Sequence, residues 1–264
     1  MSDLLTALFL GFIEGLTEFL PVSSTGHLLV LTDLLDFPAA SGHVFEIFIQ
    51  LGAILAVVVL YWKKFWHTAR YALFEKTPRR FALNLMIGTL PALILGALGH
   101  DFIKEHLYRL PVIATALIIG GILILWLEKR TKTVAITNVD DIPLKTAFFI
   151  GCAQCIALIP GISRSGATIM GSLGLGLSRP AAAEFSFFLA VPVMCAAVAY
   201  DTLKSWDSLM ETGYWTLLWS GFFSAFLTAL LVMKIAIRII NHSGFMPFAV
   251  YRIFAGLLIF MFFL

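Results

Sequence analysis

The sequence has little charge for its length. Only 13% of its 264 residues are Asp, Glu, Lys or Arg, whereas 60% are hydrophobic, and the mean hydropathy is +0.94. A soluble domain needs more polar surface than this, so the composition predicts an all-α polytopic membrane protein with a single membrane domain over 1–264. The formal net charge is only +2, and no basic run is interleaved with aromatic residues, which excludes a nucleic-acid partner.

Cysteine residues and targeting signals are also scarce. The three cysteines lie in apolar stretches and provide no disulfide framework. Cys152 and Cys155 form a CxxC, but on an apolar helix they merely share a face, which argues against a redox or metal site. The N-terminus lacks a cationic segment and a small-residue cleavage site, so we expect residues 4–20 to be retained rather than removed as a signal peptide.

Apolar runs long enough to cross a bilayer, whose hydrocarbon core is about 30 Å thick, predict six membrane spans. Their bounds are 46–62, 82–99, 111–127, 181–200, 215–233 and 247–264. Two further apolar regions, 4–31 and 146–177, are broken in the middle by Pro, Gly and hydroxyl residues. Non-helical backbone at membrane depth needs surrounding protein or a water-filled cavity. Each broken region is therefore predicted to be a re-entrant hairpin of two half-helices around a polar tip.

The two predicted hairpins are related by an offset of 140 residues. Gly11, Glu14, Ser23, Thr25 and Gly26 fall on Gly151, Gln154, Ser163, Ser165 and Gly166. The chain is therefore predicted to be a duplication, with repeat one over 1–130 and repeat two over 140–264, each holding one hairpin and three spans. Because three spans are an odd number, the second half enters from the opposite side of the membrane. This is the inverted-topology repeat that is typical of transporters.

The distribution of Lys and Arg predicts the orientation of the chain. Alternate connections between spans carry twelve of these residues on one side and three on the other. By the positive-inside rule the twelve face the cytoplasm, so both termini and the entry of the first hairpin are expected to face outward. The second hairpin then enters from the cytoplasm, and the two tips can meet inside the protein.

The first hairpin contains two carboxylates in an otherwise apolar stretch. Glu14 and Glu18 are four residues apart, so on a helix they share a face, where they repel one another unless a cation stands between them. An alternative is an interfacial helix whose acids lie in water, but intramembrane carboxylates are functional by default. We therefore predict that Glu14 and Glu18 hold a divalent cation, Mg²⁺ or Ca²⁺, with Glu18 also catalytic.

The tip that follows is rich in hydroxyl groups. Pro21 ends the first helix, and the turn Ser23-Ser24-Thr25-Gly26 opens a second short helix predicted over 27–31. Hydroxyls beside free backbone N–H groups at a helix start can bind an anion. His27 adds a titratable group next to this turn, and its alternative is a purely structural imidazole. A cation site, an anion site and a histidine in one hairpin suggest phosphoryl chemistry.

The second tip places Arg164 where the first has Ser24. Its planar guanidinium can hold two oxygens of a phosphate at once. The alternative is an ion pair between Arg164 and Glu14 or Glu18 that ties the hairpins together and could open when metal and substrate arrive. The other polar positions of the two tips are candidates for substrate binding, namely Ser23, Thr25, Gly26, Ser163, Ser165, Gly166 and Thr168.

Other polar residues are expected to be structural. Glu46 and Glu184 open equivalent spans, where a carboxylate favours a helix N-terminus. Arg252 lies within the last span and needs an anionic partner, for which Glu46 or Glu184 is the expected candidate. The remaining histidines lie in or next to connections and are expected to be solvated, namely His43, His67, His100, His106 and His242.

Three segments of the sequence carry a family resemblance. EGLTEFLPVSSTGH at 14–27, PGISRSGAT at 160–168 and EFSFFLAVP at 184–192 resemble the signature segments of bacterial undecaprenyl-diphosphate phosphatases, the family linked to bacitracin resistance. The resemblance covers the whole chain. It implies hydrolysis of an isoprenoid diphosphate lipid to the monophosphate, with a divalent cation, in the bacterial plasma (inner) membrane. That reaction recycles the lipid that carries cell-wall glycan precursors.

By motif position, the acidic residues of the family correspond to Glu14 and Glu18, its tip serine and histidine to Ser24 and His27, and its arginine to Arg164. Two mechanisms stay open, because either Ser24 attacks the terminal phosphorus with His27 as base, or His27 orients a water. In both, Arg164 stabilises the charge that develops on the phosphoryl oxygens.

A rival interpretation is a transporter or flippase of the polyprenyl phosphate lipid, because broken helices in an inverted repeat are transporter architecture. Two carboxylates beside hydroxyls and a histidine favour the enzyme, since moving an anionic head group calls for basic residues more than acids. The sequence leaves open whether the chain forms a homodimer.

Overall fold

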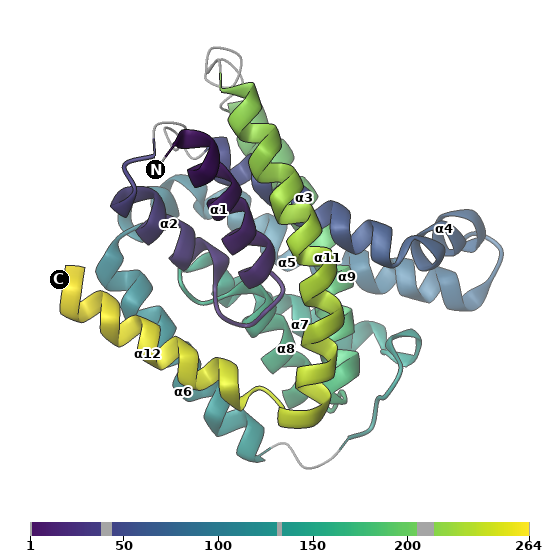
Figure 1. Ribbon diagram of the computed structural model, residues 1–264. Coiled ribbons are helices and arrows are strands. Elements are labelled where there is room, and N and C mark those ends of the chain that lie inside the picture. The colour runs from purple at the N-terminus through teal and green to yellow at the C-terminus, as the bar shows by residue number, and fades with distance from the viewer. Residues whose placement is uncertain (1, 38–43, 131–133, 205–213, 264) are drawn as a thin grey trace.

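The computed structural model describes residues 2–37, 44–130, 134–204 and 214–263 (Figure 1). Within these ranges the chain is helical almost throughout, so the predicted all-α class is confirmed. The helices are α1 (Asp3–Thr17), α2 (Ser24–Leu34), α3 (Val44–Leu60), α4 (Trp62–Tyr71), α5 (Lys76–His106), α6 (Leu110–Arg130), α7 (Leu144–Gln154), α8 (Arg164–Gly174), α9 (Arg179–Lys204), α11 (Trp215–Ser243) and α12 (Met246–Phe263). Two short 3₁₀ helices, η2 (Val139–Asp141) and η3 (Cys155–Leu158), flank α7.

The described residues include five helices that are long and apolar enough to cross a membrane, namely α5, α6, α9, α11 and α12. A sixth span is completed if α3 is counted together with α4, which bends away from it by 75°. The prediction of a multi-pass membrane protein is confirmed. The bend coincides with a change in the sequence from apolar to basic, since Lys63, Lys64 and Arg70 all lie in α4. Figure 1 shows α4 and the start of α5 reaching away from the other helices.

Both broken regions form pairs of half-helices, α1 with α2 and α7–η3 with α8. The second helix of each pair begins at the tip itself, so α2 starts at Ser24 rather than at the predicted residue 27. Ser23 and Ser163 cap these helices with nearly the same left-handed backbone, at φ 71° and 73°. Their side chains accept hydrogen bonds from the backbone N–H groups of Gly26 and Gly166, at 3.4 and 3.1 Å. Capping offsets the cost of a left-handed conformation at a non-glycine residue.

The first half-helix of each hairpin packs closely on a long helix of the other half of the chain. Gly11 of α1 lies against Gly221 of α11, and Gly151 of α7 lies against Gly88 of α5. A Cβ atom added at Gly11 or Gly151 would come 2.9 or 3.0 Å from the facing glycine Cα, so only glycine permits this approach. A two-fold relation between the halves would produce such reciprocal contacts, and the inverted repeat remains a prediction.

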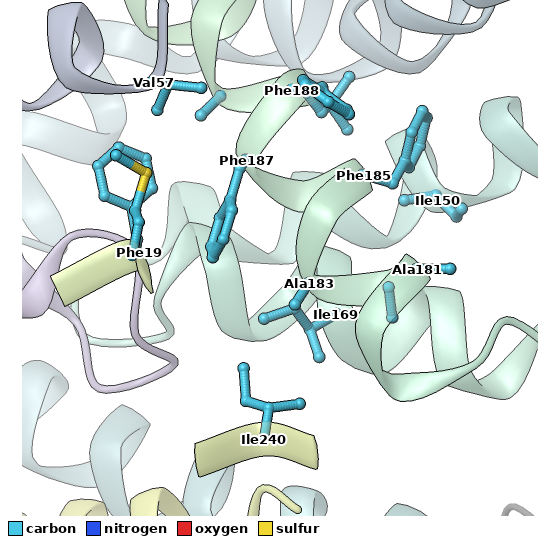
Figure 2. Packing of buried hydrophobic residues seen from close by; sticks show 14 of the residues in the cluster. Phe19, Val57, Ile150, Ile169, Ala181, Ala183, Phe185, Phe187, Phe188 and Ile240 are labelled. Atoms are coloured by element: carbon cyan, nitrogen blue, oxygen red, sulfur yellow. The ribbon is translucent and has the colours of Figure 1, made fainter. Parts of the chain in front are cut away.

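The packing centre of the molecule is α9, which presents three fully buried phenylalanines, Phe185, Phe187 and Phe188. Figure 2 shows Phe187 pointing toward Phe19, which belongs to the first tip. The two rings meet edge to face at 5.5 Å between centroids. Ile169 of α8 lies on the same side of α9 (Figure 2). Aromatic pairs of this geometry add to the stabilisation from burial, so packing against α9 stabilises both hairpins.

Candidate active site

The two hairpin tips are in direct contact. The Nη2 group of Arg164 donates a hydrogen bond to Oε1 of Glu18 at 2.9 Å, forming an ion pair in which both side chains are largely buried. Beside it, the hydroxyl of Ser165 donates to the backbone carbonyl of Leu20 at 2.7 Å. The ion pair considered as the alternative for Arg164 is therefore present, with Glu18 as the partner.

Glu18 connects the arginine of one tip to the hydroxyl of the other. Its second oxygen, Oε2, accepts a hydrogen bond from the hydroxyl of Ser24. Arg164 is held in turn by the carbonyl of Ser186 on α9, at 2.9 Å from Nη1, and its guanidinium lies 5.8 Å from the ring centroid of Phe19. A carboxylate that accepts from a serine hydroxyl can take its proton, and the neighbouring guanidinium can hold an anion.

This arrangement lines a cavity of about 450 Å³. The predicted site residues on its wall are Glu18, Ser23, Ser24, Thr25, Ser163 and Arg164. A smaller adjoining cavity of about 100 Å³ is lined by Glu14 and Glu46 and shares Ser24 and Thr25 with the larger one. The volumes and the mixed polar and apolar walls suit a small anionic head group.

The other predicted residues lie beside the cavities rather than on their walls. Thr168 donates to the carbonyls of Arg164 and Ser165, and its hydroxyl lies 2.7 Å from that of Ser186. Gly26, Ser165 and Gly166 take part in the caps and tip contacts described above. These residues shape and join the tips, and their roles in substrate binding remain predictions.

His27 is half-buried, and both of its ring nitrogens have partners within the protein. Nδ1 lies 2.7 Å from the carbonyl oxygen of Ser23, and Nε2 lies 2.5 Å from the hydroxyl of Tyr251 on α12. The imidazole also stacks on the Tyr251 ring, at 5.6 Å between centroids. These contacts join the start of α2 to α12, and the hydroxyl of Ser24 donates to the carboxylate of Glu18 rather than to His27.

Glu14 is 1% exposed, and its Oε1 atom has no hydrogen-bond partner among the described residues. A buried carboxylate oxygen without a donor is costly, and it fits the ligand type that Mg²⁺ and Ca²⁺ prefer. Across the described ranges, the structure gathers no group of three or more His, Cys, Asp or Glu side chains that could hold a metal ion. Any cation held here would therefore take few ligands from the protein and more from substrate and water.

Arg252 shows where the sequence-based interpretation was wrong. All five N–H groups of its guanidinium donate to backbone carbonyl oxygens, those of Pro21, Gly161 and Ile162 at the two tips and two in α6. The partner is therefore not the carboxylate of Glu46 or Glu184. Broken helices leave carbonyls without N–H partners, and this arginine supplies the missing donors. The sequence did contain a sign of this contact, namely two broken helices together with one arginine in an apolar span that has no counterpart in the other half.

The prediction that His100 is solvated was also wrong. Its side chain is only 15% exposed, lines the larger cavity, and lies 3.1 Å from a carboxylate oxygen of Asp201. His67, His106 and His242 are exposed, as expected. His43 lies outside the described residues.

The comparison with known families decides what kind of protein carries this site. A sequence model described as Bacitracin resistance protein BacA matches residues 7–258. The chain belongs to the BacA family. It is 48% identical over 258 residues to an undecaprenyl-diphosphatase of Sphingopyxis alaskensis, covering 97% of this chain and 96% of the relative. It is 49% identical over 256 residues to one of Nitrosospira multiformis, covering 97% and 93%. The resemblance drawn from the three motifs is confirmed.

In this BacA family member, the three signature segments converge on one place. The first supplies Glu18 and Ser24, the second supplies Arg164, and the third contributes Ser186, whose carbonyl holds the arginine. Sequence reasoning identified the third segment but gave Ser186 no role, because a backbone carbonyl leaves no mark in the identity of its side chain.

Proposed function

We propose that the chain hydrolyses undecaprenyl diphosphate to undecaprenyl phosphate and inorganic phosphate. The observation that carries this proposal is the hydroxyl of Ser24 donating to Glu18, beside Arg164, on the wall of a cavity between two membrane hairpins. The names of the curated BacA relatives support the same reaction, and they do not favour the flippase alternative. The product is the lipid carrier that cell-wall synthesis reuses.

For the chemical step, we infer that Ser24 is the nucleophile and Glu18 its base. Oγ of Ser24 attacks the terminal phosphorus while its proton passes to Glu18, and the bond from that phosphorus to the bridging oxygen breaks. The lipid monophosphate leaves with the bonding electron pair, and a water then cleaves the phosphoserine to release inorganic phosphate. Arg164 turns from Glu18 to the phosphoryl oxygens as their charge develops. A water oriented by His27 is less favoured, because both imidazole nitrogens already have partners.

A divalent cation, Mg²⁺ or Ca²⁺, is proposed at Glu14 and Glu18. The unpartnered Oε1 of Glu14 supports this assignment, and Mg²⁺ is commonly bound by one or two carboxylates together with substrate phosphates and water. When bound, the ion would neutralise charge on the diphosphate. Thorough chelation should abolish turnover, and adding back Mg²⁺ or Ca²⁺ should restore it. An unchanged rate after chelation would contradict the metal proposal.

The proposed setting is the bacterial plasma membrane, with both termini outside the cytoplasm. The excess of Lys and Arg in alternate connections supports this orientation. A reporter enzyme that is active only outside the cytoplasm, fused to the C-terminus, should be active. Activity of a strictly cytoplasmic reporter in its place would reverse the topology.

The decisive experiment measures phosphate release from purified undecaprenyl diphosphate. Glu18→Gln should lower kcat by about 10²–10⁴-fold, the usual contribution of a general base. Arg164→Ala should lower it by about 10²–10³-fold, as expected on loss of a donor to a developing oxyanion. Matched controls are Glu105→Gln and Arg238→Ala, whose side chains are exposed, and these should retain wild-type rates. Wild-type rates in the first two variants would refute the assignment.

The identity of the attacking group needs a separate test. With substrate labelled in its terminal phosphate, rapid quenching should trap label on the wild-type protein and none on Ser24→Ala. Turnover of Ser24→Ala at a rate close to wild type, with no label on either protein, would instead establish attack by water.

A further inference from the structure

Gln154 is a buried amide that the mechanism above does not use. It is the last residue of α7 and occupies the position in the second hairpin that Glu14 has in the first. Its side chain is 2% exposed and lines the larger cavity together with Arg164. Neither Oε1 nor Nε2 of Gln154 has a hydrogen-bond partner among the described residues.

An amide left in this state is unusual, because buried polar groups are nearly always hydrogen-bonded. Two buried polar residues on the same cavity wall do have partners in the protein, since Ser24 donates to Glu18 and Ser163 contacts Ser165 at 3.0 Å. The Nε–H of Arg164 is a second buried donor without a partner within the described chain. Two unmatched groups on one hairpin, both in residues that line one cavity, point to a ligand of that cavity as their partner.

The chemistry of the two hairpins then divides between them. The unmatched atom on the first hairpin is an acceptor, Oε1 of Glu14, which suits a cation. The second hairpin offers the unmatched N–H donors of Gln154 and Arg164, which suit an anion, beside the unmatched amide oxygen of Gln154. A carboxylate at position 154 would repel a phosphate, but a neutral amide can donate to it. Glu14 is therefore suited to a cation and Gln154 to an anion, although the 140-residue offset relates their positions.

We propose that Gln154 is a substrate-binding residue whose Nε2–H donates to a non-bridging oxygen of the diphosphate, next to Arg164. The inference rests on the proposed function, because it takes the diphosphate as the ligand. The same contact would form with inorganic pyrophosphate, which lacks the lipid. Gln154 positions the phosphoryl group and takes no part in proton transfer, so its loss raises KM more than it lowers kcat.

The test compares Gln154→Met, which keeps the length of the side chain without its polar atoms, with Gln154→Glu, which adds a charge of the wrong sign. Gln154→Met should raise KM for undecaprenyl diphosphate by about ten- to a hundredfold, the loss of a hydrogen bond to a charged group. Gln154→Glu should raise it further. The control is Thr89→Val, which removes a buried hydroxyl on α5 that bonds only to its own helix at Leu85, and its KM should match wild type.

Melting temperature separates this binding role from a structural one. Without ligand, Gln154→Met should melt at or above the wild-type temperature, because an unpaired polar group has been removed. Added pyrophosphate should raise the melting temperature of the wild-type protein and not that of the variant. A wild-type KM in Gln154→Met, or a lowered melting temperature with an unchanged pyrophosphate shift, would overturn the inference. If the wild type released no phosphate, the proposed function would fail, while the pyrophosphate shift would still decide the role of Gln154.

Discussion

Replacing Arg252 with methionine should loosen both hairpin tips at once. The guanidinium of Arg252 is almost completely buried and donates to the carbonyls of Pro21, Gly161 and Ile162 at 2.8–3.1 Å. Within the described residues these three carbonyls receive no other backbone hydrogen bond. Methionine can fill much of the same space, but it has no donor to offer them.

The expected loss of stability follows from those three carbonyls. A buried acceptor that loses its donor costs about 1–3 kcal/mol, so the three together cost roughly 3–9 kcal/mol. Removing the guanidinium also removes the cost of burying a charge, which offsets part of the loss. We therefore expect the free energy of unfolding to fall by about 3 kcal/mol, which corresponds to a decrease in Tm of roughly 6–12 °C at about 2–4 °C per kcal/mol.

The assay is thermal unfolding of the purified full-length protein, followed by tryptophan fluorescence, together with phosphate release. Arg238→Met is the matched control, because Arg238 is exposed on α11 and its replacement should leave Tm unchanged. Gly120→Ala approaches the same contact from α6, since an added Cβ would lie 2.7 Å from Cζ of Arg252, and it should lower Tm and turnover together. If Arg252→Met had the Tm and the turnover of the wild type, the idea that this arginine holds the tips would be wrong.

Two further predictions test the hairpins. Gly151→Leu should prevent folding or lower Tm sharply, because its side chain would enter the backbone of Gly88, whereas Gly174→Ala, which meets nothing within 4 Å, should leave Tm unchanged or slightly raised; equal melting of both variants would contradict the close packing. Ser163→Ala should cost about 1 kcal/mol, measured as a lower Tm, because the N–H of Gly166 loses its acceptor. A Tm equal to wild type would show that this cap contributes nothing.

The hairpins and spans could be predicted because the sequence marks them directly. Pro21 and Pro160, with glycines and hydroxyls beside them, interrupt apolar runs that would otherwise be continuous. The contact between Glu18 and Arg164 could be predicted in outline, since two opposite charges inside a membrane gain most by meeting. The end of the first span at residue 62 was predicted, because lysines follow Trp62, but the helix α4 that continues from it at 75° was not.

What could not be predicted depends on partners that are far away or that belong to the backbone. His27 follows Ser24 closely in sequence, which suggested a base for its hydroxyl. In the structure, Nε2 of His27 instead lies beside the hydroxyl of Tyr251, which is 224 residues further along the chain. The partners of Arg252 are backbone carbonyls, and because every residue type has one, the sequence does not mark which of them bind the arginine. Gln154 differs again, because its position was marked by the predicted repeat, whereas its lack of a partner appears only once the helices are packed.

The reciprocal glycine contacts limit how this chain can be divided. Since α1 rests on α11 and α7 rests on α5, neither half contains the surface that its own hairpin needs. A polypeptide of half this length could satisfy those surfaces only by associating with a second copy of itself. The predicted duplication would join two such copies in one chain and make that association permanent.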